Sequence, residues 1–349
     1  MPKSPTPSTI IVETDILSKL ATRCKIKSSH VAIIADSSVA NYAQEITKGL
    51  KQAHIPYTVI ECKASESIKR LATIEQWAKQ LVKAGLQRDG VVIGIGGGIV
   101  GDMAGFLASI YMRGLRYIAI PTTVLAMADS SLGGKTGVDL EDGKNLLGSF
   151  YTASHVVMDP RVLSGLSDRQ YRMGFAEIIK HAIIADKVFF TFLEKNASVI
   201  LARRREILVK VLKKSAQIKM KIVGKDPLES LSKVTKKGTS RMLVNYGHTV
   251  GHAVELLSDF SIPHGEAVAI GMVAENRLAI GKKLLKEKDA QRIKELLKRY
   301  NLPTAFPSTI SNQRLKSAMM KDKKRVGNKV YFALATRIGA AKIVPYVIA

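Results

Sequence analysis

The segment Asn245–Glu266 concentrates the residues that are best suited to catalysis. Three of the chain's seven histidines, His248, His252 and His264, fall within seventeen residues here. His248 and His252 are four residues apart, so both imidazoles would project from one face of a helix. His264 follows Pro263 at a predicted helix start and could fold back onto that face. Because imidazole is the commonest metal ligand and a catalytic zinc takes three protein ligands, the spacing favours a metal site over a polar helix face.

A carboxylate that could complete this ligand set is Glu177. Glu177 and Lys180 are three residues apart, so they share nearly the same face of a predicted helix whose neighbouring residues are apolar. An ion pair on the surface is the alternative interpretation. A buried carboxylate, however, would need a cation beside it. Since two histidines and one glutamate form a known catalytic zinc set, Glu177 is the candidate anionic ligand.

A glycine-rich turn, Gly94–Asp102, follows a predicted buried strand and opens a helical stretch. Glycines there would let the backbone approach a pyrophosphate, and the helix N-terminus supplies free N–H groups. Tight packing of strand on helix is the alternative. The spacing differs from the GxGxxG of a Rossmann first turn and falls at the third predicted strand, which indicates a dinucleotide site of another α/β architecture. Asp36, at the end of the first predicted strand, could bind a ribose hydroxyl or cap a helix.

Polar, glycine-rich segments follow the later strands of this half. We interpret them as loops at the ends of parallel strands, where open α/β sheets bind ligands. Their lysines could bind phosphate or carboxylate, and their short hydroxyls could contact a cofactor or cap a turn. The candidate residues are Thr122, Thr123, Asp129, Lys135, Lys144 and Asn145.

These residues lie in two halves of the chain whose sequence patterns predict different secondary structure. In the first, β-branched segments alternate with amphipathic helices, which predicts a parallel sheet covered on both faces. The second half reads as long helices, with one small hairpin. We therefore predict a Rossmann-like α/β nucleotide-binding domain over residues 1–165 and an all-α metal- and substrate-binding domain over residues 166–349. The predicted strands span 31–35, 57–61, 90–95, 117–120 and 156–158; the helices span 42–53, 68–84, 169–186, 188–194, 206–223, 248–258, 265–285, 289–300 and 310–321; the hairpin joins 329–334 to 341–347.

Composition narrows the function classes. Cys24 and Cys62 are the only cysteines and lack metal or redox spacing, which indicates a reducing compartment. Without a signal peptide or an apolar window long enough to span a membrane, we expect a cytoplasmic protein. The net charge of +25 would suit a nucleic-acid binder, but the basic residues are dispersed and aromatics make up only 6% of the chain. We expect no nucleic-acid partner, because an anionic substrate or a general basic bias explains the charge as well.

Six segments in order resemble the 3-dehydroquinate synthase family, and together they cover about residues 60–280. A weaker Asp-Lys-Lys match follows at 322–324. A single segment of this kind is only moderately specific, whereas six in the family's order are very specific. The segments are GGGIVGDMAGFLASIYMRG, IPTTVLAMADSSLGGKTGVD, GKNLLGSFY, GFAEIIKHA, NYGHTVGHAVE and IPHGEAVAIGM.

The resemblance implies a homodimeric enzyme that converts 3-deoxy-D-arabino-heptulosonate 7-phosphate to 3-dehydroquinate and phosphate in the shikimate pathway of aromatic amino acid biosynthesis. NAD would oxidise a ring alcohol transiently, with zinc or cobalt assisting its deprotonation. Phosphate would leave by elimination, the hydride would return, and an intramolecular aldol step would close the carbocycle. The enzyme would be a lyase that is redox-neutral overall.

The resemblance also implies residue roles. The metal would be held by Glu177, His248 and His264, and His252 would move from ligand to substrate contact. The catalytic side chains would be Lys135, Lys180, Lys219, Asn245 and His252. Substrate would also contact Asp129, Asn145, Arg241 and Lys323, and Arg113 would reach the phosphate from the partner subunit. NAD would contact Asp36, Glu66, Lys69, Gly97, Gly98, Ile99, Val100, Gly101, Asp102, Thr122, Thr123, Lys135, Lys144, Val162, Leu163, Ser164 and Gly165.

The chain departs from the family pattern in several places. Ala64-Ser65-Glu66 replaces Asp-Gly-Glu, Asp226-Pro227 replaces Asp-Glu, and His181 replaces a tyrosine. The spacing between Glu229 and Arg241 is about eight residues longer and includes Leu231–Gly238, a lysine-rich loop that we expect to stay mobile until substrate binds.

Three other functions compete with the one that the resemblance implies. They are another sugar phosphate cyclase such as 2-deoxy-scyllo-inosose synthase, a polyol or glycerol dehydrogenase, and a basic RNA-binding protein that has lost catalysis. The products separate them: a carbocycle with phosphate, net NADH, or salt-sensitive RNA binding without either product.

Overall fold

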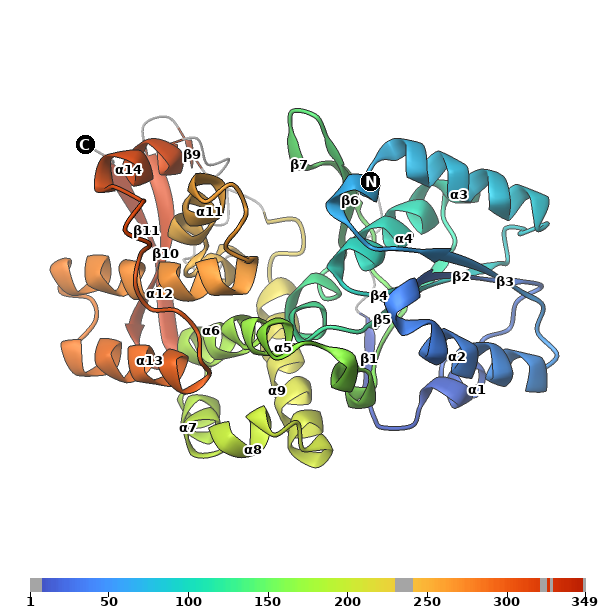
Figure 1. Cartoon of the computed structure of the whole chain (residues 1–349), viewed down its shortest axis with the longest axis horizontal. Helices are drawn as coiled ribbons and strands as arrows, with labels where there is room; N and C mark the ends of the chain where they lie inside the picture. The colour runs from blue at the N-terminus through green and yellow to red at the C-terminus, as the bar shows by residue number, and fades with distance from the viewer. Residues whose placement is uncertain (1–7, 230–240, 321–324, 327–328, 348–349) are drawn as a thin grey trace. The chain divides into compact units, whose positions relative to one another are not determined.

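The computed structural model describes residues 8–229, 241–320, 325–326 and 329–347 of the 349-residue chain. The chain divides into two compact units. The first contains Met1–Leu166 and Leu208–Ala216, and the second contains Ser167–Ile207 and Gln217–Ala349. Figure 1 shows the elements of both.

The first unit is built on a six-stranded sheet with the strand order β1-β8-β5-β4-β2-β3, in which every pairing is parallel. The central strands are buried on both faces because their sequences are continuous apolar runs. The structure confirms the five predicted strands and adds a four-residue edge strand. The bounds are β1 Thr9–Val12, β2 Val31–Asp36, β3 Tyr57–Cys62, β4 Val91–Gly96, β5 Arg116–Pro121 and β8 His155–Met158.

Helices cover both faces of this sheet. In Figure 1, α1 and α2 lie on one side and α3 and α4 on the other. α2 and α3 are amphipathic and turn apolar side chains spaced three or four residues apart toward the sheet, among them Ile46 and Leu50 of α2 and Trp77 and Leu81 of α3. The bounds are η1 Leu17–Lys19, α1 Leu20–Arg23, η2 Ser37–Val39, α2 Ala40–Gln52, η3 Glu66–Ile68, α3 Leu71–Lys83, α4 Gly98–Ile110, η4 Tyr111–Arg113, η5 Ala126–Ser130 and η6 Pro160–Gly165.

An antiparallel hairpin occupies a segment that the sequence analysis interpreted as loops, so that interpretation was wrong. Its strands are β6 (Lys135–Leu140) and β7 (Gly143–Phe150). Glycine allows the two backbones to approach closely, because a Cβ at Gly148 would lie 2.1 Å from the carbonyl oxygen of Thr136. Thr136 also packs against Gly105 of α4. The hairpin therefore depends on tertiary packing that a polar, glycine-rich sequence does not reveal.

The second unit is helical, as predicted, and contains the predicted hairpin, to which a short third strand is added. The predicted helix over 169–186 is divided at Gly174 into α5 and α6. None of the described helices has the length and apolar character needed to cross a membrane. The bounds are α5 Asp168–Met173, α6 Phe175–Ala185, α7 Lys187–Lys195, α8 Ala197–Leu201, α9 Arg205–Val223, η7 Arg241–Asn245, α11 His248–Leu257, α12 His264–Gly281, α13 Glu287–Arg299, α14 Asn312–Met320, β9 Arg325–Val326, β10 Lys329–Arg337 and β11 Ala340–Val347.

α12 lies between α11 and α13 (Figure 1) and packs closely against the start of α11. A Cβ at Gly271 would lie 2.0 Å from the carbonyl oxygen of Gly247, the residue that precedes α11. Gly247 itself has a φ of 82°, a left-handed conformation that favours glycine. Close helix packing therefore fixes the position at which α11 begins, and with it His248.

This packing predicts that Gly271→Ala lowers the stability of the protein by about 1–3 kcal/mol, because the added methyl group must displace the Gly247 backbone. Zinc affinity should fall in the same variant, since His248 follows that backbone directly. Thermal unfolding and zinc titration measure the two effects. Gly281→Ala is the matched control, because a Cβ at that end of α12 meets no atom of the described residues within 4 Å. Equal melting temperatures for the two variants would contradict the packing argument.

Candidate functional site

The second unit brings Glu177 of α6, His248 of α11 and His264 of α12 together, with one donor atom of each within 4.8 Å of the others. The Nε2 atoms of both histidines lie 3.4 Å from Oε1 of Glu177. Three elements that are distant in sequence thus direct two imidazole nitrogens and one carboxylate oxygen at a common point. This donor set is one of those that catalytic zinc sites use.

Glu177 and Lys180 form a buried ion pair, so the surface-pair interpretation is wrong. Glu177 is 0% exposed and Lys180 is 1% exposed, and the Lys180 ammonium contacts Oε2 of Glu177. Burial of a lone carboxylate would cost several kcal/mol, and the adjacent cation offsets that cost. Oε1 of the same carboxylate is the oxygen that faces the histidines.

The other ring nitrogen of each histidine faces a hydrogen-bond acceptor. His248 Nδ1 lies 3.2 Å from the carbonyl oxygen of Tyr246, and His264 Nδ1 lies 3.2 Å from Oε2 of Glu255. A carbonyl oxygen can only accept, so His248 carries its proton on Nδ1 and its Nε2 lone pair points toward Glu177. Acceptors at Nδ1 are the usual outer partners of metal-binding histidines, and these residues therefore fit a divalent metal.

The two imidazoles differ in charge. Burial lowers the pKa of His248 well below its usual value, and Lys180 lowers it further, so this ring is neutral at pH 7. Burial also lowers the pKa of His264, but its hydrogen bonds to Glu177 and Glu255 outweigh burial and raise the pKa to about 10. Without a metal, His264 is therefore protonated at neutral pH, and a metal that binds Nε2 must displace a proton.

The start of α11 is held by Glu275 of α12, a buried residue that the sequence analysis missed. Its Oε2 accepts a hydrogen bond from Gly247 N at 2.6 Å, and its Oε1 accepts from Val250 N at 3.3 Å. A carboxylate at a helix N-terminus satisfies free N–H groups and interacts favourably with the helix dipole. The signal in the sequence was an acidic residue inside an apolar helix. Glu255 was also missed, although it lies seven residues after His248 on the same helix face.

The other described residues that were predicted for this unit lie on α9, η7 and α11. His252 is exposed on α11, with its ring centroid 5.3 Å from that of His248. Asn245 donates from Nδ2 to Oε1 of Glu229 at 2.9 Å, so Glu229 lies beside η7 despite the longer spacing before Arg241. Lys219 of α9 and Arg241 of η7 are both buried. Lys323 and the loop Leu231–Gly238 lie outside the described residues.

In the first unit, the glycine-rich turn joins β4 to the N-terminus of α4. A Cβ at Gly94 or Gly96 would lie within 2.8 Å of a side chain of α4, so these two glycines serve strand–helix packing. Gly97 differs: its φ of −73° suits any residue, and beyond its chain neighbours a Cβ there would meet a single atom of the described residues, Thr123 Cγ2 at 3.4 Å. Neither backbone conformation nor packing requires glycine at 97, whereas a bound pyrophosphate would.

Lys69 joins several predicted cofactor and substrate residues in one network. Its ammonium donates to Asp102 Oδ2 at 2.7 Å and to Asn145 Oδ1 at 2.5 Å. Burial raises the pKa of Asp102, although Lys69 acts in the opposite direction. Lys144 pairs with Glu66 at 3.2 Å. The network links η3, α4 and β7, and so fixes the hairpin next to the start of α4.

The structure also places the other predicted residues of the first unit, two of which accept hydrogen bonds from backbone N–H groups. Asp36 accepts a hydrogen bond from Ser38 N at 3.0 Å, which bears out the capping alternative for this residue. Thr123 Oγ1 likewise accepts from Ala126 N at 3.0 Å. Lys135 is exposed on β6, Asp129 is partly buried in η5, and Arg113 ends η4 with a φ of 67°. Thr122 is buried after β5, and Val162, Leu163, Ser164 and Gly165 form the end of η6.

Comparison with known proteins identifies the family. Residues 59–173 match the family model of the 3-dehydroquinate synthase N-terminal domain, and residues 174–325 match that of the C-terminal domain. The 3-dehydroquinate synthase of Xylella fastidiosa strain M23 is 40% identical over 329 residues, which cover 92% of this chain and 87% of that protein. The chain belongs to the 3-dehydroquinate synthase family.

Two solved structures of synthases share this fold. One is 2-epi-5-epi-valiolone synthase (ValA) from Streptomyces hygroscopicus subsp. jinggangensis 5008 with NAD+ and Zn2+ bound, with a TM-score of 0.85 at 26% identity, covering 99% of this chain and 94% of that chain. The second is 2-deoxy-scyllo-inosose synthase complexed with carbaglucose-6-phosphate, NAD+ and Co2+. Its TM-score is also 0.85, at 25% identity, and the match covers 99% of this chain and 97% of that chain.

The protonated state of His264 predicts that zinc binding at about pH 6.5 releases roughly one proton per metal, because His248 is already neutral. Because His264 must lose its proton when zinc binds, this residue alone should make zinc affinity fall about tenfold for each unit that the pH is lowered between about pH 8 and pH 6. Calorimetry in buffers of different ionisation enthalpy counts the protons. A proton count near zero, with affinity independent of pH, would show that His264 is neutral before the metal arrives.

Because a Cβ at Gly97 has room, Gly97→Ala should leave the melting temperature within about 1 °C of wild type. It should weaken NAD binding by roughly tenfold, because the methyl group would lie where the pyrophosphate of NAD approaches the backbone. Gly96→Ala is the contrasting variant, since its Cβ would lie 2.7 Å from Val100 and should destabilise the fold. NAD titration and thermal unfolding separate the two effects. Unchanged NAD affinity in Gly97→Ala would remove this turn from the cofactor site.

Proposed function

We propose that this chain is a 3-dehydroquinate synthase, which converts 3-deoxy-D-arabino-heptulosonate 7-phosphate to 3-dehydroquinate and phosphate. The observation that carries the proposal is the convergence of Glu177, His248 and His264 in a chain that is 40% identical to a 3-dehydroquinate synthase over 92% of its length. In this proposal, the first unit binds NAD and the second unit binds the metal and the substrate.

In the proposed metal site, Glu177, His248 and His264 hold a divalent ion, zinc or cobalt. When bound, the metal supplies Lewis acidity that favours deprotonation of a substrate alcohol, and NAD accepts and returns a hydride. The Lys180 ammonium already balances the charge of the Glu177 carboxylate. The positive charge of the metal could therefore stabilise an anionic oxygen of the substrate. Lys180 would also contact that oxygen, because its ammonium lies against the same carboxylate.

The buried cations of the second unit suit a substrate with both a carboxylate and a phosphate. Arg241 is held by its own hydrogen bonds, from its N to Asp226 Oδ2 at 3.2 Å and from Nη1 to the Pro227 carbonyl at 2.8 Å. The first bond fixes the backbone and the second restrains the guanidinium, which favours binding of an anion. We propose that Arg241, Lys219, Asn245 and His252 contact the substrate, together with Asp129, Lys135, Asn145 and Lys323.

For NAD, we propose the residues of the glycine-rich turn, Gly97–Asp102, with the α4 N-terminus facing the pyrophosphate. The short side chains after β5, the Lys69 network, Asp36 and the end of η6 would complete the contacts. The enzyme would be a redox-neutral lyase in the cytoplasm. We further propose a homodimer in which Arg113 reaches the phosphate bound by the partner subunit.

The test is phosphate release from 3-deoxy-D-arabino-heptulosonate 7-phosphate with substoichiometric NAD and added zinc. We expect multiple turnovers without net NADH. His264→Ala should lower the rate by at least about 100-fold, beyond the 10–100-fold typical of outer partners of a metal. His54→Ala, which changes an exposed histidine of the first unit, should leave the rate unchanged.

Other outcomes identify the alternatives. NADH formed in proportion to a polyol substrate would indicate a dehydrogenase. Phosphate release from a different sugar phosphate, with none from the named substrate, would indicate another cyclase. Either result from folded, metal-loaded protein would overturn the proposal.

A further inference from the structure

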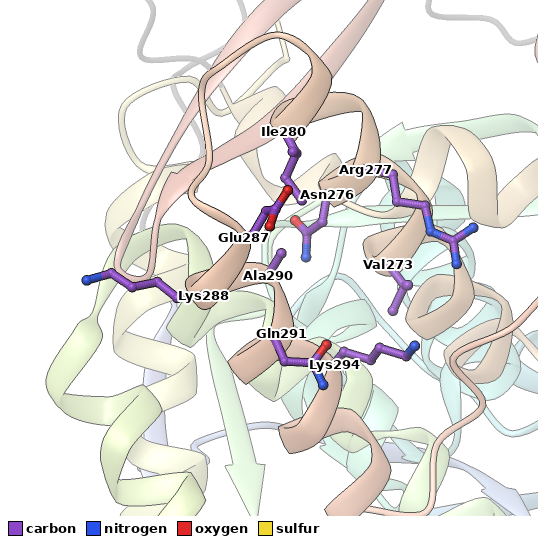
Figure 2. Close-up of a pocket in the computed structure, with 9 residues that line it drawn as sticks. All are labelled: Val273, Asn276, Arg277, Ile280, Glu287, Lys288, Ala290, Gln291 and Lys294. Carbon is purple, nitrogen blue, oxygen red and sulfur yellow. The ribbon is translucent and has the colours of Figure 1, made fainter.

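A pocket of about 500 Å³ lies between α12 and α13 in the second unit. Figure 2 shows the side chains that surround it. Its volume is in the range of small-molecule sites. The lining combines apolar side chains of both helices with charged and amide groups: Val273, Asn276, Arg277, Ile280, Glu287, Lys288, Ala290, Gln291 and Lys294.

Asn276 supplies a buried donor to this pocket. The residue is 2% exposed, and its Oδ1 accepts a hydrogen bond from the Tyr246 hydroxyl at 2.6 Å. Its Nδ2 has no hydrogen-bond partner within the part of the chain that the structure describes. In Figure 2 this nitrogen points toward Ala290 and Gln291 at the centre of the lining. A buried amide N–H without a partner costs about 1–3 kcal/mol, and a ligand oxygen would recover that cost.

The charges around the pocket are unbalanced. Arg277, Lys288 and Lys294 face a single carboxylate, Glu287, and none of the three cations pairs with another described residue. In Figure 2, Arg277 and Lys294 extend to the same side of the pocket, on either side of Val273, whereas Lys288 lies at the opposite side. Two cations beside an apolar surface are suited to an acidic group attached to an apolar body.

The pocket lies away from His264, whereas Tyr246 connects its residue Asn276 to His248. Asn276 lies twelve residues beyond His264 on α12, which is roughly 18 Å along the helix axis. None of the residues proposed to bind the metal lines the pocket.

We propose that this pocket is a second ligand site, which binds a small organic anion with an apolar body. An oxygen of the ligand accepts a hydrogen bond from Asn276 Nδ2. Arg277 and Lys294 neutralise its acidic group, and Val273, Ile280 and Ala290 contact its apolar part. The site does not depend on the proposed cyclase activity.

The test uses 2-naphthoate as the anionic probe and 2-naphthamide, its neutral counterpart of nearly the same shape, in calorimetric titrations of the zinc-loaded protein. We expect 2-naphthoate to bind with a dissociation constant below about 10 mM and at least about fivefold more tightly than 2-naphthamide, which corresponds to about 1 kcal/mol. Lys294→Gln and Arg277→Gln should each weaken 2-naphthoate binding by about fivefold.

Lys298→Gln is the matched control, because Lys298 lies on α13 outside the pocket and pairs with Glu295. It should leave 2-naphthoate affinity unchanged. All variants are compared at equal zinc content and melting temperature, so that a folding defect is recognised. Failure of 2-naphthoate to bind, equal binding of the two probes, or equal loss in Lys298→Gln would each overturn the proposal.

Discussion

The buried carboxylate of Glu177 is the constraint on which the second unit depends. It has no exposed surface, so its charge must be balanced within the protein, and Lys180 supplies the balancing cation one turn along α6. Its second oxygen faces the Nε2 atoms of His248 and His264, which come from two further helices. α6, α11 and α12 must therefore keep a fixed arrangement, because a shift of any one would leave a buried charge without its partners.

That arrangement is maintained by groups that take no part in chemistry themselves. Gly271 brings α12 close to Gly247, and Glu275 binds the free N–H groups at the start of α11. Tyr246 contributes twice: its carbonyl oxygen accepts from His248, and its hydroxyl donates to Asn276. α12 thus supplies one proposed metal ligand and also fixes the orientation of another, which explains why a single helix is buried along so much of its length.

The sequence predicted much of this site but not its supporting residues. Spacing singled out His248, His252 and His264 together, and only the family resemblance selected His248 and His264 over His252, which is exposed. Glu255 and Glu275 were missed, because their positions on the helices do not reveal their partners, which depend on how α11 and α12 pack. The parallel sheet followed from apolar runs, but the edge strand β1 has only four residues, and the β6–β7 hairpin has a polar sequence whose pairing depends on contact with α4.

Anomalous diffraction from zinc-loaded crystals would show which side chains bind the metal. The described residues offer a second possible group, His252, Glu255 and His264, which shares one histidine with the proposed set. We expect an anomalous peak about 2.0–2.2 Å from Glu177 Oε1 and from the Nε2 atoms of His248 and His264. A peak bound by His252 and Glu255, with Glu177 still paired only to Lys180, would contradict this expectation.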